Sequence, residues 1–260
     1  MKDNLVVLGG GESGIGAAYL AKKNGIKVFL SDKNLIHNKY KKILSDNKIE
    51  FEEGNHSLNK LLSATEVVKS PGISDDSNLI NKIRINNIPI ISEVEFASRF
   101  TNAKIIGITG SNGKSTTTSL IYHILKSSGF NVGVAGNIGN SFSFLVANSD
   151  YEFIVLELSS FQLDGILTFK PQIAVITNLS PDHLERYQNN FENYINSKFN
   201  IVLNHEISDY LIYNSDDLKI INELNRRKIN SNKISFSFSK KNFSNQVYIE
   251  KNMIKSEINK

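Results

Sequence analysis

Cysteine is absent from all 260 residues of the sequence. Its absence excludes disulfide bonds, thiolate zinc sites and thiol nucleophiles, so any metal ion must be held by oxygen or imidazole ligands. Long apolar runs are absent too, because none approaches the roughly 20 residues that a membrane-spanning helix needs. The N-terminal stretch MKDNLVVLGG also lacks the apolar segment and small-residue cleavage site of a signal peptide. We therefore expect a protein of the cytoplasm.

A strong excess of one charge sign is missing as well. The formal net charge is +4 and the isoelectric point is about 9.0, which would suit polyanionic ligands. The lysines are scattered, however, and no basic stripe is interleaved with aromatic residues, so nucleic acid is not an expected partner. Internal repeats and long low-complexity segments are also absent, which excludes solenoid arrays. The length suits two ordinary domains, each with its own core.

The first part of the chain alternates short apolar runs with amphipathic segments. This alternation predicts strands separated by helices, and hence an α/β fold with a parallel sheet. We expect an N-terminal Rossmann-like domain at residues 1–93, with Gly25 as the cap that follows its first helix. The expected elements are strands at residues 4–8, 27–30, 66–69 and 88–91 and a helix at residues 92–100.

The rest of the chain repeats this alternation and then changes character. We expect an α/β central domain at residues 94–260, similar to P-loop ATPase domains, with ligands at the carboxyl ends of its strands. Glu157 and Asn178 each follow such a strand end. Near the C-terminus, apolar residues on both sides of residues 251–252 predict an antiparallel hairpin. The expected elements are strands at residues 103–108, 131–134, 153–156 and 173–177, a helix at 115–128, and a hairpin of 246–249 with 253–254.

A first glycine-rich turn, GGGESG at residues 9–14, follows the first expected strand. Gly9, Gly11 and Gly14 satisfy the G-x-G-x-x-G pattern, in which glycine permits a tight turn and lets a diphosphate approach a helix N-terminus. Asp32 lies at the end of the second strand, where an acidic residue can bind a ribose. Taken alone the turn suggests NAD, although any nucleoside diphosphate could use the same cradle.

A second glycine-rich turn lies near the middle of the chain, in the sequence GITGSNGKSTT. It offers consecutive backbone donors, a lysine and hydroxyl groups at a helix start, which suits ATP with Mg²⁺. Lys114 is expected to reach the β- and γ-phosphates, and Ser115 to bind the metal ion. The turn departs from G-x-x-x-x-G-K-[ST], because Ile108 stands six residues before Lys114 and the first glycine is Gly110. The expected nucleotide-binding residues are Gly110, Ser111, Asn112, Gly113, Lys114, Ser115 and Thr116.

A series of motifs resembles a known family. TGSNGKST, AGNIG, ELSSFQL, NLSPDHLERY and NSDD follow one another as in the Mur ligases of peptidoglycan precursor synthesis, and the resemblance covers residues 5–217. Within that family, ELSSFQL is similar to the branch that adds D-glutamate. The resemblance implies that the Rossmann-like domain holds the UDP of a UDP-sugar, which leaves NAD as a minor alternative. The implied substrate contacts are Gly11, Glu12, Ser13, Asp32, Ser70, Pro71, Gly72, Asn137 and Ser159.

The resemblance also implies a reaction. In this family ATP makes a carboxylate electrophilic by forming an acyl phosphate, and an amine then displaces inorganic phosphate. Here the carboxylate would be that of UDP-N-acetylmuramoyl-L-alanine and the amine that of D-glutamate, so the expected enzyme is an ATP-dependent amide ligase that acts on small molecules. We expect it to be a monomer.

Catalytic roles follow from the same resemblance, for Lys114, Glu157, His183 and Lys198. Glu157 resembles a magnesium ligand, and His183 resembles the family histidine that binds a second Mg²⁺ at the reacting carboxylate. Lys198 matches a lysine that is carbamylated in the family, although from sequence alone it is a surface helix lysine. The implied metal ligands are Ser115, Glu157, His183 and Lys198. The other histidines are expected to be structural; they are His37, His56, His123 and His205.

Two further hypotheses stay open. Family members carry a third domain that binds D-glutamate, so the resemblance implies that the central domain is incomplete at its C-terminal end and that the chain is a fragment, a split-gene product or a remnant. A non-catalytic module that binds UDP-sugar or nucleotide is therefore one alternative. The other is an NAD-dependent oxidoreductase built on the first glycine-rich turn, which leaves Lys114 and ELSSFQL without a role.

Overall fold

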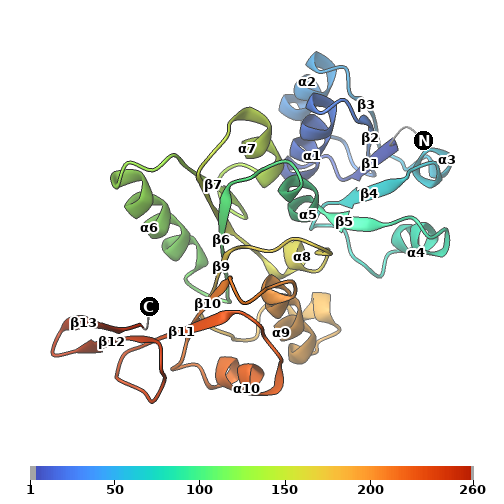
Figure 1. Cartoon of the computed structure of the whole chain (residues 1–260). Helices are drawn as coiled ribbons and strands as arrows, with labels where there is room; N and C mark the ends of the chain where they lie inside the picture. The colour runs from blue at the N-terminus through green and yellow to red at the C-terminus, as the bar shows by residue number, and fades with distance from the viewer. Residues whose placement is uncertain (1–3, 259–260) are drawn as a thin grey trace. The chain divides into compact units, whose positions relative to one another are not determined.

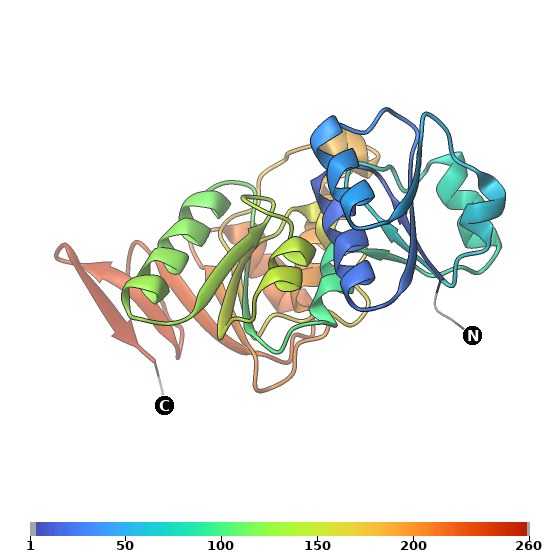
Figure 2. The same ribbon diagram turned by 90° about the horizontal axis from the view of Figure 1, so that it is seen from above.

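The computed structural model describes residues 4–258 (Figures 1 and 2). Contacts divide the chain into two compact units, neither of which is continuous in sequence. Unit 1 holds the chain up to Asn102 together with Val134–Tyr151 and Phe161–Phe169. Unit 2 holds Ala103–Gly133, Glu152–Ser160 and the chain from Lys170 onward. The domain division expected from the sequence, between residues 93 and 94, stays a prediction.

Unit 1 is built on a parallel five-stranded sheet with the order β3-β2-β1-β4-β5. The central strands β1 and β4 are apolar runs whose valines are fully buried, as a sheet covered on both faces requires. The strands are β1 (Asn4–Leu8), β2 (Lys27–Asp32), β3 (Glu50–Glu53), β4 (Glu66–Lys69) and β5 (Ile90–Ser92). The helices are α1 (Glu12–Lys23), α2 (Asn38–Asp46), α3 (Leu58–Leu62), α4 (Asn78–Ile85), α5 (Glu93–Ser98) and α7 (Phe142–Asn148).

Helix α1 lies directly against the segment that begins α7. A Cβ atom at Gly16 would lie 2.0 Å from the Oγ of Ser141, so glycine is required for this approach. Ser141 in turn caps α7 by accepting a hydrogen bond from the N–H of Phe144 at 3.3 Å. The motif AGNIG, which precedes Ser141, is thereby held on unit 1.

Unit 2 is built on an eight-stranded sheet with the order β13-β12-β11-β10-β9-β6-β8-β7, whose edge strand β7 continues into the unit 1 segment that starts at Val134. Neighbouring strands from β8 to β12 pair in parallel, and the β12–β13 hairpin is antiparallel. The strands are β6 (Lys104–Thr109), β7 (Val132–Gly136), β8 (Phe153–Glu157), β9 (Ile173–Ile176), β10 (Tyr210–Asn214), β11 (Asn232–Ser237), β12 (Gln246–Glu250) and β13 (Met253–Glu257). The helices are α6 (Lys114–Ser127), α9 (Phe191–Phe199) and α10 (Leu218–Arg226), with short 3-10 turns η1 (Leu184–Tyr187) and η2 (Asn200–Val202). The short helix α8 (Ser160–Leu163) begins at the last residue of a unit 2 segment and continues in unit 1.

The expected α/β class with parallel sheets is confirmed, and so is the antiparallel hairpin. A hydrophobic cluster that includes Ile106, Ile108, Val155 and Val175 supports β6, β8 and β9. Within residues 4–258, no helix combines the length and the apolar character needed to cross a bilayer.

Candidate functional site

The second glycine-rich turn joins β6 to α6 at the carboxyl end of the unit 2 sheet. Gly110 has a φ of +142° and Gly113 a φ of +81°, backbone conformations that favour glycine. A Cβ atom on Gly110 would lie 2.0 Å from the Oγ1 of Thr177, so this position also lacks room for a side chain. The displaced first glycine of the pattern is therefore required here because the turn packs tightly against the end of β9.

The segment that follows β9 holds this turn in place. The N–H of Asn112 donates to the Oδ1 of Asn178 at 2.9 Å, and the Nδ2 of Asn178 donates back to the Asn112 carbonyl at 2.9 Å. The hydroxyl of Thr177 donates to the same carbonyl at 2.7 Å. The turn is thus preorganised by neighbouring backbone and amide groups, which leaves its outward N–H groups available for an anion.

A buried tyrosine, Tyr194, contacts the second glycine-rich turn through Ser111. The Oγ of Ser111 lies 3.0 Å from the hydroxyl of Tyr194 and 2.8 Å from the Ser180 carbonyl, to which it donates. Tyr194 is 1% exposed, and burial raises the pKa of its hydroxyl, which keeps the group neutral and able to share a proton with Ser111. The sequence analysis did not identify Tyr194 as a site residue. The only feature of the sequence that pointed to it was its position one helical turn before Lys198.

Two lysines meet at the carbonyl oxygen of Gly110. The Nζ of Lys114 donates to this oxygen at 3.0 Å and to the Ser111 carbonyl at 2.9 Å, and the Nζ of Lys198 donates to it at 2.8 Å. Lys198 is 2% exposed, with its Nζ 4.5 Å from the centre of the Tyr194 ring. It is a buried residue beside the turn rather than the surface lysine that its sequence context suggests. The positive charge of Lys114 at this turn favours a polyphosphate.

The predicted metal ligands are distributed around this turn. Ser115 is exposed at the start of α6, while Glu157 is 1% exposed at the end of β8, where it pairs in register with Ile108 of β6. His183 sits on a left-handed turn with a φ of 50°, and its side chain is 58% exposed. Within the described residues, His, Asp and Glu side chains form no group of three or more that could hold a metal ion. The four-residue metal set stays a prediction.

The first glycine-rich turn is held by the acidic residue at the end of β2. The Oδ2 of Asp32 accepts from the N–H of Gly10 at 2.6 Å, and its Oδ1 accepts from the N–H of Asn34 at 2.8 Å. A Cβ atom at Gly14 would lie 1.8 Å from the Gly9 carbonyl oxygen, whereas none of the described atoms comes within 4 Å at Gly11. Gly14 therefore serves packing, and Gly11 leaves open the approach to the α1 N-terminus.

Ser70, which directly follows β4, is a second polar residue near this turn in unit 1. The Oγ of Ser70 is buried and has no hydrogen-bond partner among the described residues. It lies 2.6 Å from the position that a Cβ on Gly9 would take, so it faces the first glycine-rich turn. A buried hydroxyl group without a partner is costly, and a polar ligand would satisfy it.

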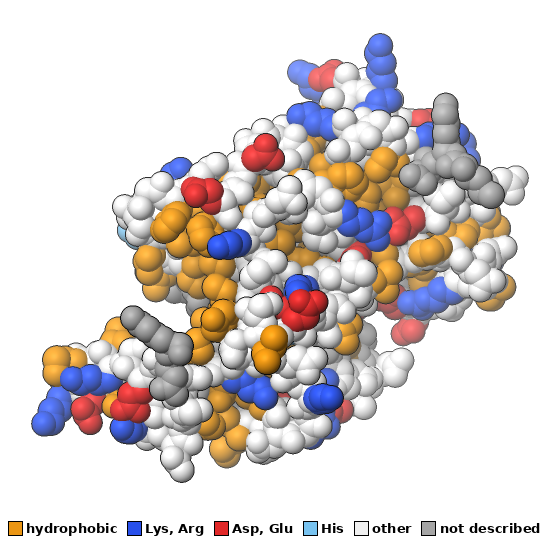
Figure 3. Space-filling view, viewed as in Figure 1, with side chains coloured by type: hydrophobic (Ala, Val, Ile, Leu, Met, Phe, Trp, Pro, Cys, Tyr) orange, Lys and Arg blue, Asp and Glu red, His pale blue; other side chains and the backbone are white. Residues whose placement is uncertain are grey.

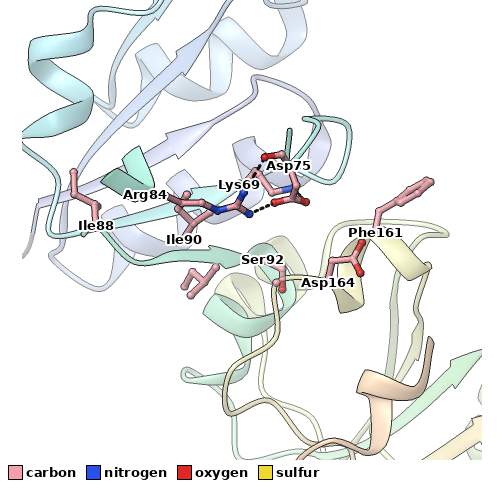
Figure 4. Close-up of a pocket in the computed structure, with 10 residues that line it drawn as sticks. Lys69, Asp75, Arg84, Ile88, Ile90, Ser92, Phe161 and Asp164 are labelled. Atoms are coloured by element: carbon pink, nitrogen blue, oxygen red, sulfur yellow. Dashed lines mark hydrogen bonds and ion pairs between the residues drawn. The ribbon is translucent and has the colours of Figure 1, made fainter. Parts of the chain in front are cut away.

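A cavity of about 160 Å³ is lined by Lys69, the last residue of β4 (Figure 4). Lys69, which is 7% exposed, donates to the Ile73 carbonyl at 2.9 Å and pairs with Asp75 at 3.1 Å. Arg84 pairs with the same carboxylate at 2.7 Å. These contacts fix the loop that carries Ser70, Pro71 and Gly72. Phe161 and Asp164 line the cavity on its other side.

The predicted residues thus divide between the two units. Gly11, Glu12, Ser13, Asp32 and the segment 70–72 belong to unit 1, as does Asn137, which is exposed after β7. The nucleotide turn, Glu157, Ser159, His183 and Lys198 belong to unit 2. These site assignments stay predictions.

Comparisons with protein families match most of the chain. The family described as the Mur ligase middle domain matches residues 108–259, and the family described as the MurD N-terminal domain matches residues 5–79. The two matches fall on the two glycine-rich turns and the segments that support them.

Curated relatives resemble the whole chain. UDP-N-acetylmuramoylalanine--D-glutamate ligase of Christiangramia forsetii is 51% identical over 259 residues, which cover 100% of this chain and 58% of the relative. The protein of the same name from Bacteroides fragilis is 53% identical over 233 residues, which cover 90% of this chain and 52% of the relative. The chain therefore spans little more than half the length of these relatives.

Solved structures share the fold. The UDP-N-acetylmuramate:L-alanyl-gamma-D-glutamyl-meso-diaminopimelate ligase from Neisseria meningitides has a TM-score of 0.63 at 18% identity, with 95% of this chain and 81% of that chain covered. The UDP-N-acetylmuramate-alanine ligase from Thermotoga maritima has a TM-score of 0.55 at 22% identity, with 94% and 54% covered. At such low identity these matches describe the fold alone.

Proposed function

The chain belongs to the Mur ligase family, and we propose that it carries the UDP-sugar site and the ATP-phosphate site of a ligase that joins D-glutamate to UDP-N-acetylmuramoyl-L-alanine. The observation that carries the proposal is the nucleotide turn, in which Lys114 and Lys198 converge on the Gly110 carbonyl. Relatives with the D-glutamate ligase name at about half identity support the choice of substrates. With these substrates, the proposed reaction would belong to cell-wall precursor synthesis in the cytoplasm.

The proposed first step transfers the γ-phosphoryl group of ATP to the alanyl carboxylate. Two negative groups must approach each other, and a pair of unit charges at 4 Å repels by about 4 kcal/mol at an effective dielectric constant near 20. The Nζ of Lys114 lies 2.9 and 3.0 Å from two carbonyl oxygens of the turn. It is therefore close enough to the turn to contact the oxygens of a phosphate bound there. In the second step the amine of D-glutamate attacks the acyl phosphate and releases inorganic phosphate.

Mg²⁺ fits the donors near the turn. The Ser115 hydroxyl and the Glu157 carboxylate are oxygen ligands of the kind that Mg²⁺ prefers, and Glu157 is buried one strand away from the turn. His183 and a carbamylated Lys198 would complete the proposed ligand set, because a carbamate replaces the ammonium charge with anionic oxygens. When bound, the ion would offset the negative charge of the phosphate oxygens.

In unit 1 the UDP-sugar would lie over the α1 N-terminus. Gly11 leaves room for a diphosphate there, and the first-turn N–H groups of α1 are suited to bind it. The hydroxyl group of Ser70 is buried and has no hydrogen-bond partner among the described residues, so the UDP-sugar would supply one. Asp32 orients the turn through the Gly10 N–H, which supports the proposed contact of the same carboxylate with the nucleoside.

Calorimetric titration of the chain with Mg·ATP, UDP-sugar and NAD tests the proposal. Lys114→Ala should weaken Mg·ATP binding at least about tenfold and leave UDP-sugar binding unchanged, because the lost cation faces the phosphates. Lys126→Ala, at the far end of the same helix, is the matched control and should bind both ligands normally. Equal Mg·ATP affinity of Lys114→Ala and the parent, or binding of NAD in preference to UDP, would contradict the proposal.

Turnover separates the ligase from a binding module. Phosphate release from ATP that requires both UDP-N-acetylmuramoyl-L-alanine and D-glutamate supports a ligase. Tight binding of both nucleotides without any phosphate release would instead favour the non-catalytic module.

A further inference from the structure

The carboxyl ends of β1, β2 and β3 lie in a row along one edge of the unit 1 sheet. The first glycine-rich turn follows β1, Asp32 ends β2, and His56 lies just after β3. Neighbouring strands are about 4.8 Å apart, so about 10 Å separates the end of β1 from the end of β3. A nucleoside diphosphate with its phosphates over β1 and its ribose at Asp32 therefore extends its base towards the residues after β3.

The segments that follow β2 and β3 are joined by hydrogen bonds. The N–H of Ile36 donates to the Oε2 of Glu53 at 2.7 Å, and the N–H of Gly54 donates to the Asn34 carbonyl at 3.4 Å. We call these two segments the rim: residues 33–36 and 54–57. Figure 3 shows lysine and acidic side chains side by side over α2, which follows the first rim segment, at the top of the view. The rim is thus fixed in shape and lies next to a charged, solvated surface.

The hydroxyl group of Ser31 decides which ring nitrogen of His56 carries the proton. The Oγ of Ser31 donates to the Oε1 of Glu52 at 2.7 Å and lies 2.7 Å from the Nδ1 of His56. Burial tends to raise the pKa of Glu52, but hydrogen bonds from Ser57 and Ser31 outweigh it and hold this pKa below its usual value. The carboxylate can therefore only accept. Because a hydroxyl group has one proton, which Ser31 gives to Glu52, the Nδ1–H of His56 must donate to Ser31.

The second ring nitrogen of His56 is left as an acceptor. Burial lowers the pKa of His56 below its ordinary value of 6.5, against the charges of Asp32 and Glu52, so the ring is neutral at pH 7. With the proton on Nδ1, the Nε2 carries a lone pair. Within residues 4–258 this Nε2 makes no hydrogen bond, and it is not enclosed. The structural role expected of His56 thus belongs to Nδ1, and Nε2 is available to a ligand.

We propose that His56 recognises the base of the UDP-sugar, with its Nε2 accepting a hydrogen bond from the N3–H of uracil. The inference rests on the proposed UDP-sugar site and adds a residue that determines which nucleotide binds there. Cytosine carries a lone pair instead of a proton at N3, so it would set one lone pair against another. A site that hydrogen-bonds a ligand N–H rejects an analogue without it, because the site's own polar group is then left unpaired.

Calorimetric titration of the full chain with UDP, CDP and 3-methyl-UDP tests the inference. The parent should bind UDP at least about tenfold more tightly than CDP or 3-methyl-UDP, because neither analogue has a proton at N3. A parent that binds all three equally well overturns the inference and leaves the proposed UDP site intact. A parent that binds none of them contradicts the proposed UDP site itself, and the inference with it.

His56→Asn separates the roles of the two ring nitrogens. The asparagine amide can replace Nδ1–H as a donor to Ser31, but its side chain is too short to place an acceptor where Nε2 stands. The variant should therefore unfold at the same temperature as the parent, while its affinity for UDP falls about tenfold and its preference over CDP is lost. His123→Asn, on the exposed face of α6, is the matched control and should keep the preference.

Two results with the variant would overturn the inference. One is a preference for UDP that persists in His56→Asn. The other is an equal weakening of all three ligands, which would show that His56 acts on the shape of the rim alone. If His56→Asn fails to fold, the titration of the parent with 3-methyl-UDP still decides, since it needs no substitution.

Discussion

Glu93 and Glu95 are buried carboxyl groups separated by one residue, and their surroundings move their pKa values in opposite directions. Burial raises the pKa of Glu93 to about 7, against the opposing hydrogen bond from the N–H of Ser143. Burial also tends to raise the pKa of Glu95. Hydrogen bonds from Thr168, Leu167 and Phe169 outweigh this effect and hold the pKa of Glu95 below its usual value. The number of donors that reach each carboxylate decides the difference.

The raised pKa of Glu93 predicts a dependence of stability on pH. The folded protein binds a proton more tightly than the unfolded chain, so this contribution is complete below about pH 4.5 and is lost as the pH rises through about 7. At roughly 1.4 kcal/mol per pKa unit the loss is on the order of 3 kcal/mol. Glu93→Gln should remove this dependence, and the measurement is the free energy of urea unfolding at several pH values.

Glu93→Asp keeps an ionisable group and serves as the control. If the parent and Glu93→Gln lose stability in parallel between about pH 5 and pH 8, Glu93 is not the titrating group.

Each glycine-rich turn between a strand and a helix contains one glycine where a side chain would clash with its neighbours and another where a side chain would meet open space. In the first turn Gly14 touches the Gly9 carbonyl and Gly11 faces open space. In the second turn Gly110 packs on Thr177, and none of the described atoms lies within 4 Å of the Cβ position at Gly113. The open position lies next to the helix N-terminus in both cases, where an anion would bind.

Substitution of the two glycines of the first turn should separate stability from binding. Gly14→Ala should lower the free energy of unfolding by about 1–3 kcal/mol or more, because the strand and helix must move apart. Gly11→Ala should change stability by no more than about 0.5 kcal/mol. It should still weaken UDP-sugar binding, because the methyl group stands where the diphosphate approaches. Chemical denaturation and calorimetry measure the two effects, and equal stability of both variants would contradict the assigned packing role.

In the molecule as a whole, the residues of the two proposed ligand sites belong to separate compact units. Each ligand should therefore protect its own unit from hydrogen exchange. UDP-sugar should slow exchange around residues 9–14 and 70–72, and Mg·ATP around residues 110–117 and 177–180. At a ligand concentration of about 100 times Kd, the bound unit gains about 2.7 kcal/mol.

Hydrogen exchange followed by mass spectrometry reads both regions in one experiment, and Lys114→Ala provides the control that should lose only the ATP-dependent protection. Protection of residues 110–117 by UDP-sugar alone would contradict the assignment of sites to units.

Several elements could not be foreseen from local pattern. β3 has the sequence EFEE and no buried residue, so it lacks the apolar run that predicts a strand and forms because its backbone pairs with β2. The expected strand at residues 88–91 begins instead at Ile90, and the helix expected from residue 92 begins at Glu93, because Ser92 serves as its N-cap. Such shifts reflect capping and pairing that residue type alone does not determine.

By itself, the sequence determined the alternation of strands and helices, the place of both glycine-rich turns and the family, because periodicity, glycine spacing and motif order are local properties. Only the tertiary structure decided that Lys198 is buried on the Gly110 carbonyl, that Tyr194 supports Ser111, and that Ser70 faces the first turn. Lys198 and Gly110 are 88 residues apart, and Ser111 and Tyr194 are 83 apart. Contacts over such separations arise from the order in which strands join a sheet, which no short stretch of sequence encodes.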